Sequence, residues 1–245
     1  MRTIEEEDSG FRIGAAVCGS ELGEHAGVRA LWPGVVEGME LIGSTQIQGR
    51  ATLVGNLCNA SPSADGVPAM VTAQATVRVF GPEGFRDCSV LDIPVSPGRT
   101  SLKKGEFITS IFLPSRPERA ADAYLRFTPR TEMDIAVSAA AVSISLDKDG
   151  TINDAHVALG AVAPTVLNVP SAAAVIIGTK LDLSTLDKLA TAASAACRPI
   201  DDKRGTAVFR IKTAGVLAQR SAKIAYKRAQ RSEEHTSELQ SHLNL

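Results

Sequence analysis

Apolar and polar positions in the first part of the chain follow patterns that predict strands and helices in turn. The apolar, β-branched run Phe11–Val17 indicates a buried strand. Ser20 then stands where a helix N-cap is expected, with Glu21 in the first turn, where a carboxylate suits the helix dipole. Helical patterns follow over residues 28–32, 34–43 and 64–73, whereas Gln46, Ile47, Thr52 and Leu53 alternate as a strand would.

The middle of the chain predicts a β-hairpin and one further strand. Residues 76–90 alternate around the turn Gly81-Pro82-Glu83-Gly84, a composition that favours chain reversal. Residues 106–114 form another strand-like run, which ends at a proline. The polar, proline-containing segment 115–122 is the predicted domain boundary.

Beyond that boundary the pattern separates into strands and then helices. Strand-like runs cover 123–128, 136–146 and 152–162, and the turn DKDG joins the last two. Helical patterns cover 171–178, 184–196, with Ser184 as its cap, and 205–229. This order predicts an α+β domain with a three-stranded antiparallel sheet and helices.

Charge and composition narrow the classes of function. The 245-residue chain carries a net charge of −1, so no broad attraction to nucleic acid or to an anionic membrane is expected. No apolar run approaches the roughly 20 residues that span a bilayer, and the acidic start lacks the apolar core of a signal peptide. The sequence therefore predicts a cytoplasmic protein without membrane insertion.

Cysteine and histidine spacing argues against a metal site in this chain. The cysteines lie far apart with no CxxC pair, which favours free thiols in a reducing compartment. His25 and His156 stand alone without triad partners, so structural roles are expected for both. The four cysteines are Cys18, Cys58, Cys88 and Cys197.

The stretch 51–66, ATLVGNLCNASPSADG, is unusually rich in Gly, Asn, Ser and Asp. Such a composition is typical of a plain surface turn. It also suits a loop where glycine lets a ligand approach the backbone and where successive N–H groups form a concavity for an anion or a carbonyl oxygen. On the residues alone both interpretations stay open, and the plain turn is the commoner one.

The end of the chain does not read as part of the fold. Residues 231–242, RSEEHTSELQSH, correspond to the in-frame translation of a common sequencing-library adapter. We therefore expect 231–245 to be a non-native tail and exclude it from the fold prediction.

Three stretches occur together in an order and spacing known from one family. They are FRIGAAV with LGEH, STQIQGRATLVGNLCNASPSAD, and YLRFTPRTEMDIAVSAAAVSI. On these motifs the chain resembles the FAD-binding medium subunit of molybdenum hydroxylases, over about residues 1–229. The resemblance implies an α+β protein with a PCMH/VAO-type FAD-binding domain over 1–116, lacking its first α/β unit, and a C-terminal domain over 120–230.

The resemblance also implies which residues contact FAD. Asp65 matches the acid that holds the FAD hydroxyls, and the polar positions before it match a flavin-contacting turn. Ile108 falls on an apolar position against the flavin ring, with core packing as its alternative role. Arg126 falls where the family usually has Lys or Arg, with a solvated strand charge as its alternative. The implied set is Thr52, Gly55, Asn56, Asn59, Ser61, Asp65, Ile108 and Arg126.

The sequence departs from the family pattern at several positions. Gln48 and Gly49 replace Arg and Asn, Ala51 replaces a Gly, and Val54 replaces the first Gly of a pair. A β-branched residue such as Val54 would be strained if the turn required a positive φ. The α/β unit with which family members begin, whose loop cradles the FAD pyrophosphate, has no counterpart, so we expect a truncated chain in which Met1 is an internal residue or a false start.

The resemblance implies electron transfer rather than catalysis by side chains. FAD would receive electrons from [2Fe-2S] clusters in an iron–sulfur small subunit, fed by the molybdenum cofactor of a molybdopterin large subunit. It would pass them to an external acceptor such as NAD, a quinone or oxygen. No catalytic residue and no metal ligand is expected in this chain, which would be inactive outside its hetero-oligomer. Two alternatives stay open: a scaffold fragment of the same fold without cofactor, and an unrelated hydrolase or lyase with Asp65 or Asp134 as base.

Overall fold

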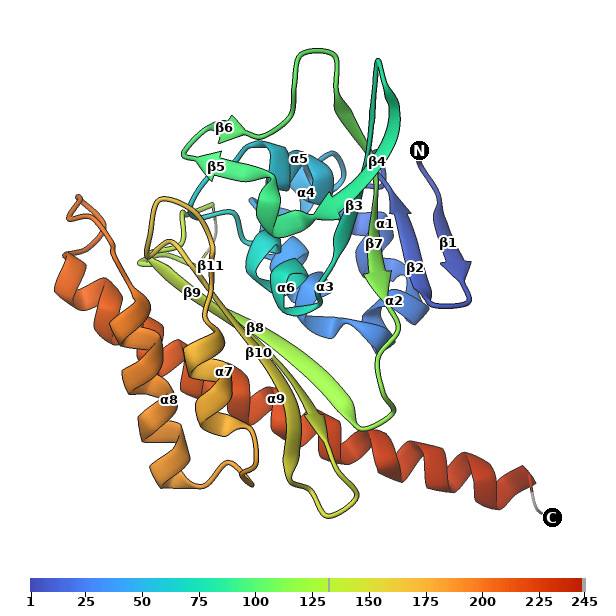
Figure 1. The fold of residues 1–245 in the computed structure, drawn as a ribbon, viewed down its shortest axis with the longest axis vertical. Coiled ribbons are helices and arrows are strands. Elements are labelled where there is room, and N and C mark those ends of the chain that lie inside the picture. Colours follow the sequence, from blue (N-terminus) through green and yellow to red (C-terminus); the bar gives the residue numbers. More distant parts are fainter. Residues whose placement is uncertain (132, 244–245) are drawn as a thin grey trace.

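Two antiparallel sheets, each covered by helices, form the body of the protein (Figure 1). The computed structural model describes the backbone of residues 1–131 and 133–243, and the side chains as far as Arg231. The expected non-native tail therefore lies almost wholly outside the residues whose side chains are described. A small two-stranded ribbon, β5 (Pro94–Ser96) with β6 (Arg99–Thr100), projects from the first half of the chain.

The first sheet has five strands in the order β1-β2-β7-β3-β4. The chain leaves it after β2, builds six helices, and returns through β3; the hairpin predicted around Gly81–Gly84 joins β3 to β4. The helices bury one face of the sheet, where Val77, Val79 and Ile111 are inaccessible to solvent. The strands are β1 (Ile4–Glu7), β2 (Gly10–Gly14), β3 (Thr76–Gly81), β4 (Gly84–Ser89) and β7 (Phe107–Pro114). The helices are α1 (Gly19–Glu24), α2 (Ala26–Leu31), α3 (Pro33–Glu40), α4 (Thr45–Gln48), α5 (Leu53–Cys58) and α6 (Gly66–Thr72), and a 3₁₀ turn η1 (Val90–Asp92) follows β4.

The second sheet lies between two helical layers. Its order is β11-β10-β9-β8, and every residue of the central strand β9 (Ser138–Leu146) is buried. The long helix α9 (Ala207–Leu243) packs across β8 and β9 on one side, while α3 and α6 pack on the other (Figure 1). The remaining elements are β8 (Ala120–Phe127), β10 (Ile152–Gly160), β11 (Leu167–Asn168), α7 (Pro170–Ile176) and α8 (Leu183–Ala196). The three predicted strands are present, and the short β11 adds a fourth.

The strand-like alternation predicted over 46–53 is wrong, because Gln46 and Ile47 lie in α4, Thr52 is the N-cap of α5, and Leu53 is its first residue. Leu53 and Leu57, one helical turn apart, are both buried. The polar positions 52, 55, 56 and 59 recur at the spacing i, i+3, i+4, i+7, which places them on one helix face. The high content of Gly and Asn concealed this helical period.

Two predicted helix caps are also displaced. The N-cap of α1 is Cys18 rather than Ser20, and the side chain of Glu21 accepts from the Cys18 N–H at 3.2 Å. The N-cap of α8 is Asp182 rather than Ser184, because its carboxylate accepts from the Thr185 N–H at 2.7 Å.

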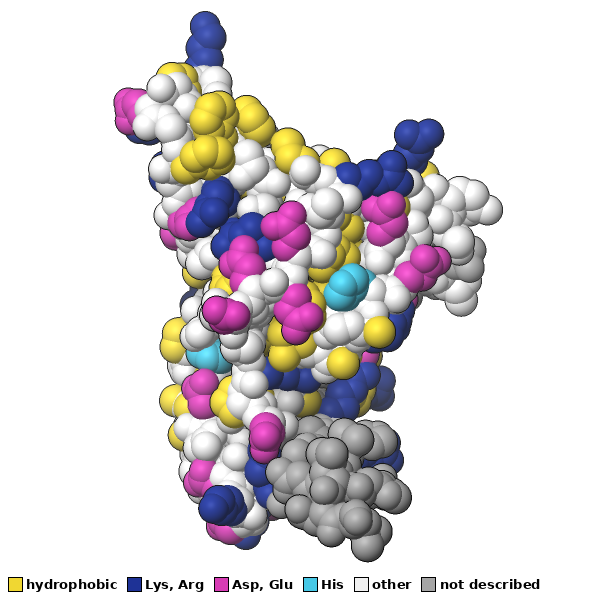
Figure 2. Space-filling view, turned by 90° about the vertical axis from the view of Figure 1, so that its right-hand side faces the viewer, with side chains coloured by type: hydrophobic (Ala, Val, Ile, Leu, Met, Phe, Trp, Pro, Cys, Tyr) yellow, Lys and Arg dark blue, Asp and Glu magenta, His cyan; other side chains and the backbone are white. Residues whose placement is uncertain are grey.

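Charged side chains of both signs are interspersed over the face shown in Figure 2, in keeping with a net charge of −1. The helices within the described residues are too short or too polar to cross a membrane.

Candidate functional site

The N-terminus of α5 leaves two backbone N–H groups without a partner inside the helix. The Thr52 hydroxyl accepts from the Gly55 N–H at 2.9 Å, and the Thr52 carbonyl accepts from the Asn56 N–H at 2.9 Å. The N–H groups of Leu53 and Val54 precede any possible partner within the helix, as the first groups of every helix do. The start of α5 can therefore donate to an acceptor brought from outside.

The polar face of α5 is accessible. Gly55 and Asn59 are exposed, and Thr52 and Asn56 are half-buried. A Cβ built on Gly55 would lie 3.1 Å from Thr52 Oγ1, its nearest neighbour. Because glycine has no side chain, a ligand can approach the backbone closely at this position. Asn56 Oδ1 accepts from the Gly66 N–H at 3.0 Å, which ties α5 to the start of α6.

Asp65 is the N-cap residue of α6, where this helix meets strand β8 of the second sheet. Its carboxylate accepts from the Tyr124 hydroxyl at 2.7 Å and from the Arg126 guanidinium at 2.5 Å. All three side chains are buried, and Tyr124 and Arg126 share one face of β8 because they are two residues apart. The alternative of a solvated strand charge for Arg126 is wrong, since its side chain is only 6% exposed.

Burial is the largest influence on the pKa values of Asp65 and Tyr124. It raises the pKa of Asp65, against the opposing hydrogen bond from Tyr124 and charge of Arg126. Burial likewise raises the pKa of Tyr124 well above its ordinary value, so the phenol stays protonated and donates. The carboxylate keeps lone pairs beyond the two in use, because an ionised carboxylate offers about four acceptor sites.

The remaining predicted residues occupy different surroundings. The Ser61 hydroxyl accepts from the Ser63 N–H at 3.2 Å in the turn between α5 and α6. Ile108 lies in β7 opposite Val79 and is buried in the core of the first half, which is its alternative role. The structure thus brings Thr52 to Asp65 into one turn with Arg126 and places Ile108 within the packed sheet.

Val54 does not carry the strain that a positive φ would impose. It lies inside α5, and the non-glycine residues with positive φ in the described chain are others: Ala60, Gln74, Met133, Ala161 and Leu181. The concern raised by the loss of the family glycine therefore does not apply to this backbone.

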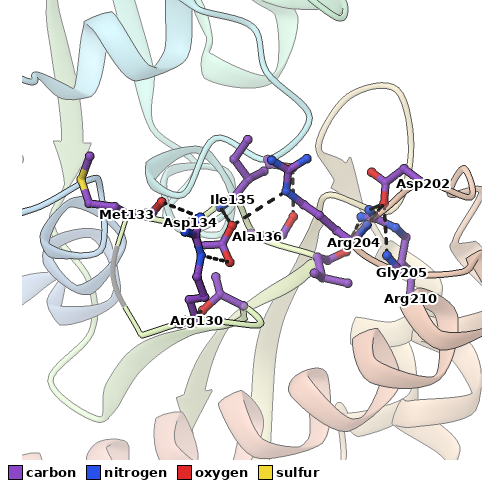
Figure 3. A network of polar contacts seen from close by, with 12 residues as sticks. Arg130, Met133, Asp134, Ile135, Ala136, Asp202, Arg204, Gly205 and Arg210 are labelled. Carbon is purple, nitrogen blue, oxygen red and sulfur yellow. Dashed lines mark hydrogen bonds and ion pairs between the residues drawn. The ribbon is translucent and has the colours of Figure 1, made fainter.

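A second polar cluster surrounds Asp134, in the segment before β9 (Figure 3). Its carboxylate accepts from the Ile135 N–H at 2.8 Å, and the Arg130 and Arg204 guanidinium groups lie at 3.4 and 3.8 Å. The Ile135 N–H and then Arg130 lower the pKa of Asp134. A lowered pKa makes Asp134 a poor general base, which disfavours Asp134 as the base of the hydrolase or lyase interpretation.

Tyr124 is part of this site but is not among the residues predicted from the sequence. Asp122, Tyr124 and Arg126 alternate along β8, so their side chains share the face that meets α3 and α6. Polar residues at every second position of an otherwise apolar strand are the sequence signal that could have identified Tyr124.

The comparisons with known proteins account for both halves of the chain. Residues 1–116 match the family described as FAD binding domain in molybdopterin dehydrogenase. Residues 123–234 match the family described as CO dehydrogenase flavoprotein C-terminal domain.

Individual relatives agree with these families. The carbon monoxide dehydrogenase medium chain of Afipia carboxidovorans is 34% identical over 231 residues, which are 92% of this chain and 78% of the relative. A putative xanthine dehydrogenase FAD-binding subunit of Escherichia coli K12 is 28% identical over 206 residues, 84% of this chain and 70% of the relative. The structure of CO dehydrogenase from Oligotropha carboxidovorans superposes with a TM-score of 0.88 at 33% identity, covering 92% of this chain and 78% of that one.

Proposed function

We propose that this chain transfers electrons from an iron–sulfur subunit through FAD to an external acceptor such as NAD or a quinone. The chain belongs to the family of FAD-binding medium subunits of molybdenum hydroxylases, which are oxidoreductases. We assign residues 1–116 to FAD binding and 120–230 to the C-terminal domain, and we place the protein in the cytoplasm. FAD supplies the redox chemistry when bound.

The observation that carries the proposal is the arrangement of α5 and Asp65. The N–H groups at the start of α5 and the side chains of Thr52, Asn56 and Asn59 suit acceptor atoms such as phosphate or carbonyl oxygens. Asp65 suits hydroxyl donors, because Tyr124 and Arg126 hold its carboxylate in place and leave acceptor sites free. Donors and an acceptor thus lie in one turn, as a ligand with both phosphates and hydroxyls requires.

Partners follow from the same family. Relatives are named as medium chains and FAD-binding subunits, so the chain is a component of a hetero-oligomer. We propose an iron–sulfur small subunit and a molybdopterin large subunit as its neighbours. Cys18, Cys58, Cys88 and Cys197 are all free thiols in the structure.

A titration with FAD tests the proposal. Quenching of flavin fluorescence by the purified chain is expected to saturate, and Asn59→Ala is expected to weaken it without lowering stability, because Asn59 is exposed on the polar face of α5. Asn153→Ala, which changes an exposed asparagine in β10, is the matched control. Absence of saturable binding by the folded wild-type chain would favour the scaffold alternative instead.

A further inference from the structure

A cavity of about 210 Å³ lies where the two halves of the chain meet, and it is lined by none of the residues proposed to contact FAD. Its walls come from the turn before α6, the β5–β6 ribbon, the segments before β9 and after β10, the loop that leads into α9, and the start of α9 itself. Convergence of distant segments from two domains is typical of a small-molecule site.

The walls of this cavity are largely apolar. Prolines and aliphatic side chains face it from both halves of the chain: Pro62, Pro97, Pro164, Pro199, Ile135 and Ile200. An engineered apolar cavity of about 150 Å³ admits benzene, so the present volume admits one six-membered ring with a substituent. The body of a fitting ligand is therefore compact and apolar.

The charge of the cavity is positive. Arg198, Arg204 and Arg210 line it together with one carboxylate, Asp202. Arg204 also pairs with Asp134, but that carboxylate is shared with Arg130, which lies nearer at 3.4 Å, so positive charge remains in excess. The site therefore favours an anionic ligand.

Arg210 is a fixed part of the wall. Its guanidinium donates to the Val137 carbonyl and to Asp202, both at 2.7 Å, and its side chain is only 5% exposed. Its Nε is buried without a hydrogen-bond partner among the described residues. An uncompensated buried donor strengthens the positive field inside the cavity.

Arg204, in contrast, is exposed, and its guanidinium makes a long ion pair with Asp134. Its side chain is 42% exposed, and its Nε lies 3.8 Å from Asp134, beyond hydrogen-bond distance (Figure 3). A ligand carboxylate can therefore recruit this guanidinium in the bidentate geometry that arginine favours.

Unusual backbone conformations also gather here. Ala161, which lines the cavity, has a φ of 62°. Met133 and Ala60, with φ of 52° and 49°, each lie two residues before a lining residue. Non-glycine residues in the left-handed region carry a conformational cost and concentrate at ligand sites.

We propose that this cavity binds a small aromatic monocarboxylate, with its ring between the proline and isoleucine walls and its carboxylate on Arg204. The proposal does not depend on FAD binding, because none of the eight residues proposed to contact FAD lines the cavity, although Pro62 and Ser63 belong to the same turn.

Isothermal titration of the full chain with benzoate tests the proposal. We expect benzoate to saturate one site per chain. The neutral isostere benzamide is expected to bind about tenfold more weakly, because it lacks the charge that Arg204 and Arg210 recognise. Acetate, which carries the charge without the ring, is expected to bind more weakly than benzoate as well.

Two variants locate the site. Arg204→Gln is expected to weaken benzoate binding about tenfold, since a charge-assisted hydrogen bond is lost. Ala163→Phe fills the cavity without changing its charge and is expected to abolish binding. Arg220→Gln removes the same charge from an exposed position on α9 and is the control, with binding unchanged.

Each other outcome overturns the proposal in a defined way. Equal binding of benzoate and benzamide, or unchanged binding by Arg204→Gln, contradicts recognition of the carboxylate. Benzoate binding that survives Ala163→Phe, in a variant whose circular dichroism melting curve shows it folded, places the ligand elsewhere. Failure of the folded wild-type chain to bind benzoate rejects the site itself.

Discussion

The hydroxyl of Tyr124 donates a 2.7 Å hydrogen bond to the carboxylate of Asp65, across 59 positions of sequence. Asp65 begins α6 in the first half of the chain, whereas Tyr124 lies in β8 of the second. The same carboxylate accepts from Arg126, so the turn proposed to hold FAD is anchored to the second sheet. The position of Asp65 therefore depends on the packing of the two halves.

Tyr124→Phe removes this hydrogen bond while keeping the ring. We expect the free energy of unfolding to fall by about 1 to 2 kcal/mol, because a buried carboxylate loses a donor. We also expect FAD to bind several-fold more weakly, since Asp65 loses part of its orientation. Urea denaturation and fluorescence titration measure the two effects.

Tyr226→Phe is the matched control for that change. The Tyr226 hydroxyl donates to the Gly150 carbonyl at 2.8 Å, in the second half of the chain and away from α5. It is expected to cost stability without changing the affinity for FAD. An equal loss of FAD affinity in both variants would show that the effect of Tyr124 is only a loss of stability.

Val54→Gly restores the family residue at a position where the structure shows no strain. Because Val54 is helical and packs against the core of the first half, we expect the glycine to lower the free energy of unfolding by about 1 kcal/mol. Chemical denaturation of the two proteins measures this difference. A stabilised glycine variant would mean that Val54 is strained after all.

Asp182→Ala and Ser184→Ala distinguish the observed cap of α8 from the one predicted by sequence. Loss of the Asp182 side chain leaves the Thr185 N–H without its acceptor, and we expect the melting temperature to fall by a few degrees. Ser184→Ala should leave it nearly unchanged. A thermal melt that ranks the two variants in the opposite order contradicts the cap assignment.

The buried carboxyl of Asp122 is expected to make the protein less stable as pH rises, which is the opposite of the usual effect of an aspartate. Burial raises the pKa of its carboxyl to about 6, although Arg116 opposes the shift. In the unfolded chain an aspartate titrates near pH 4, so between about pH 4 and 6 the native state binds a proton that the unfolded state has lost. The contribution of Asp122 to stability therefore falls as pH rises through this window.

The comparison with Asp122→Asn isolates that contribution. A shift of about two pKa units corresponds to about 3 kcal/mol, so the stability of the wild type relative to the variant is expected to fall by up to that amount between pH 4 and 6. Urea denaturation across this range measures it. A difference that rises with pH would show that the native state prefers the ionised carboxylate.

Local pattern was enough to locate most elements. The predicted strand 136–146 is β9 at Ser138–Leu146, and the predicted hairpin around Gly81–Gly84 joins β3 to β4. Apolar periodicity and turn residues are local properties, so they survive into the fold. The pattern failed over 46–58, where Gly and Asn outweighed a helical period that the buried Leu53 and Leu57 make plain.

The sequence by itself determined the α+β class, the motif-bearing turn and the family resemblance, because these depend on residues near one another in the chain. Only the tertiary structure decided that Arg126 is a buried partner of Asp65, that Tyr124 joins them, and that arginines from the loop before α9 face Ile135 and Pro62 across one cavity. Such contacts arise when two sheets and their helices pack. Tyr124 and Arg126 lie 59 and 61 positions from Asp65, and no local sequence pattern predicts a contact over that separation.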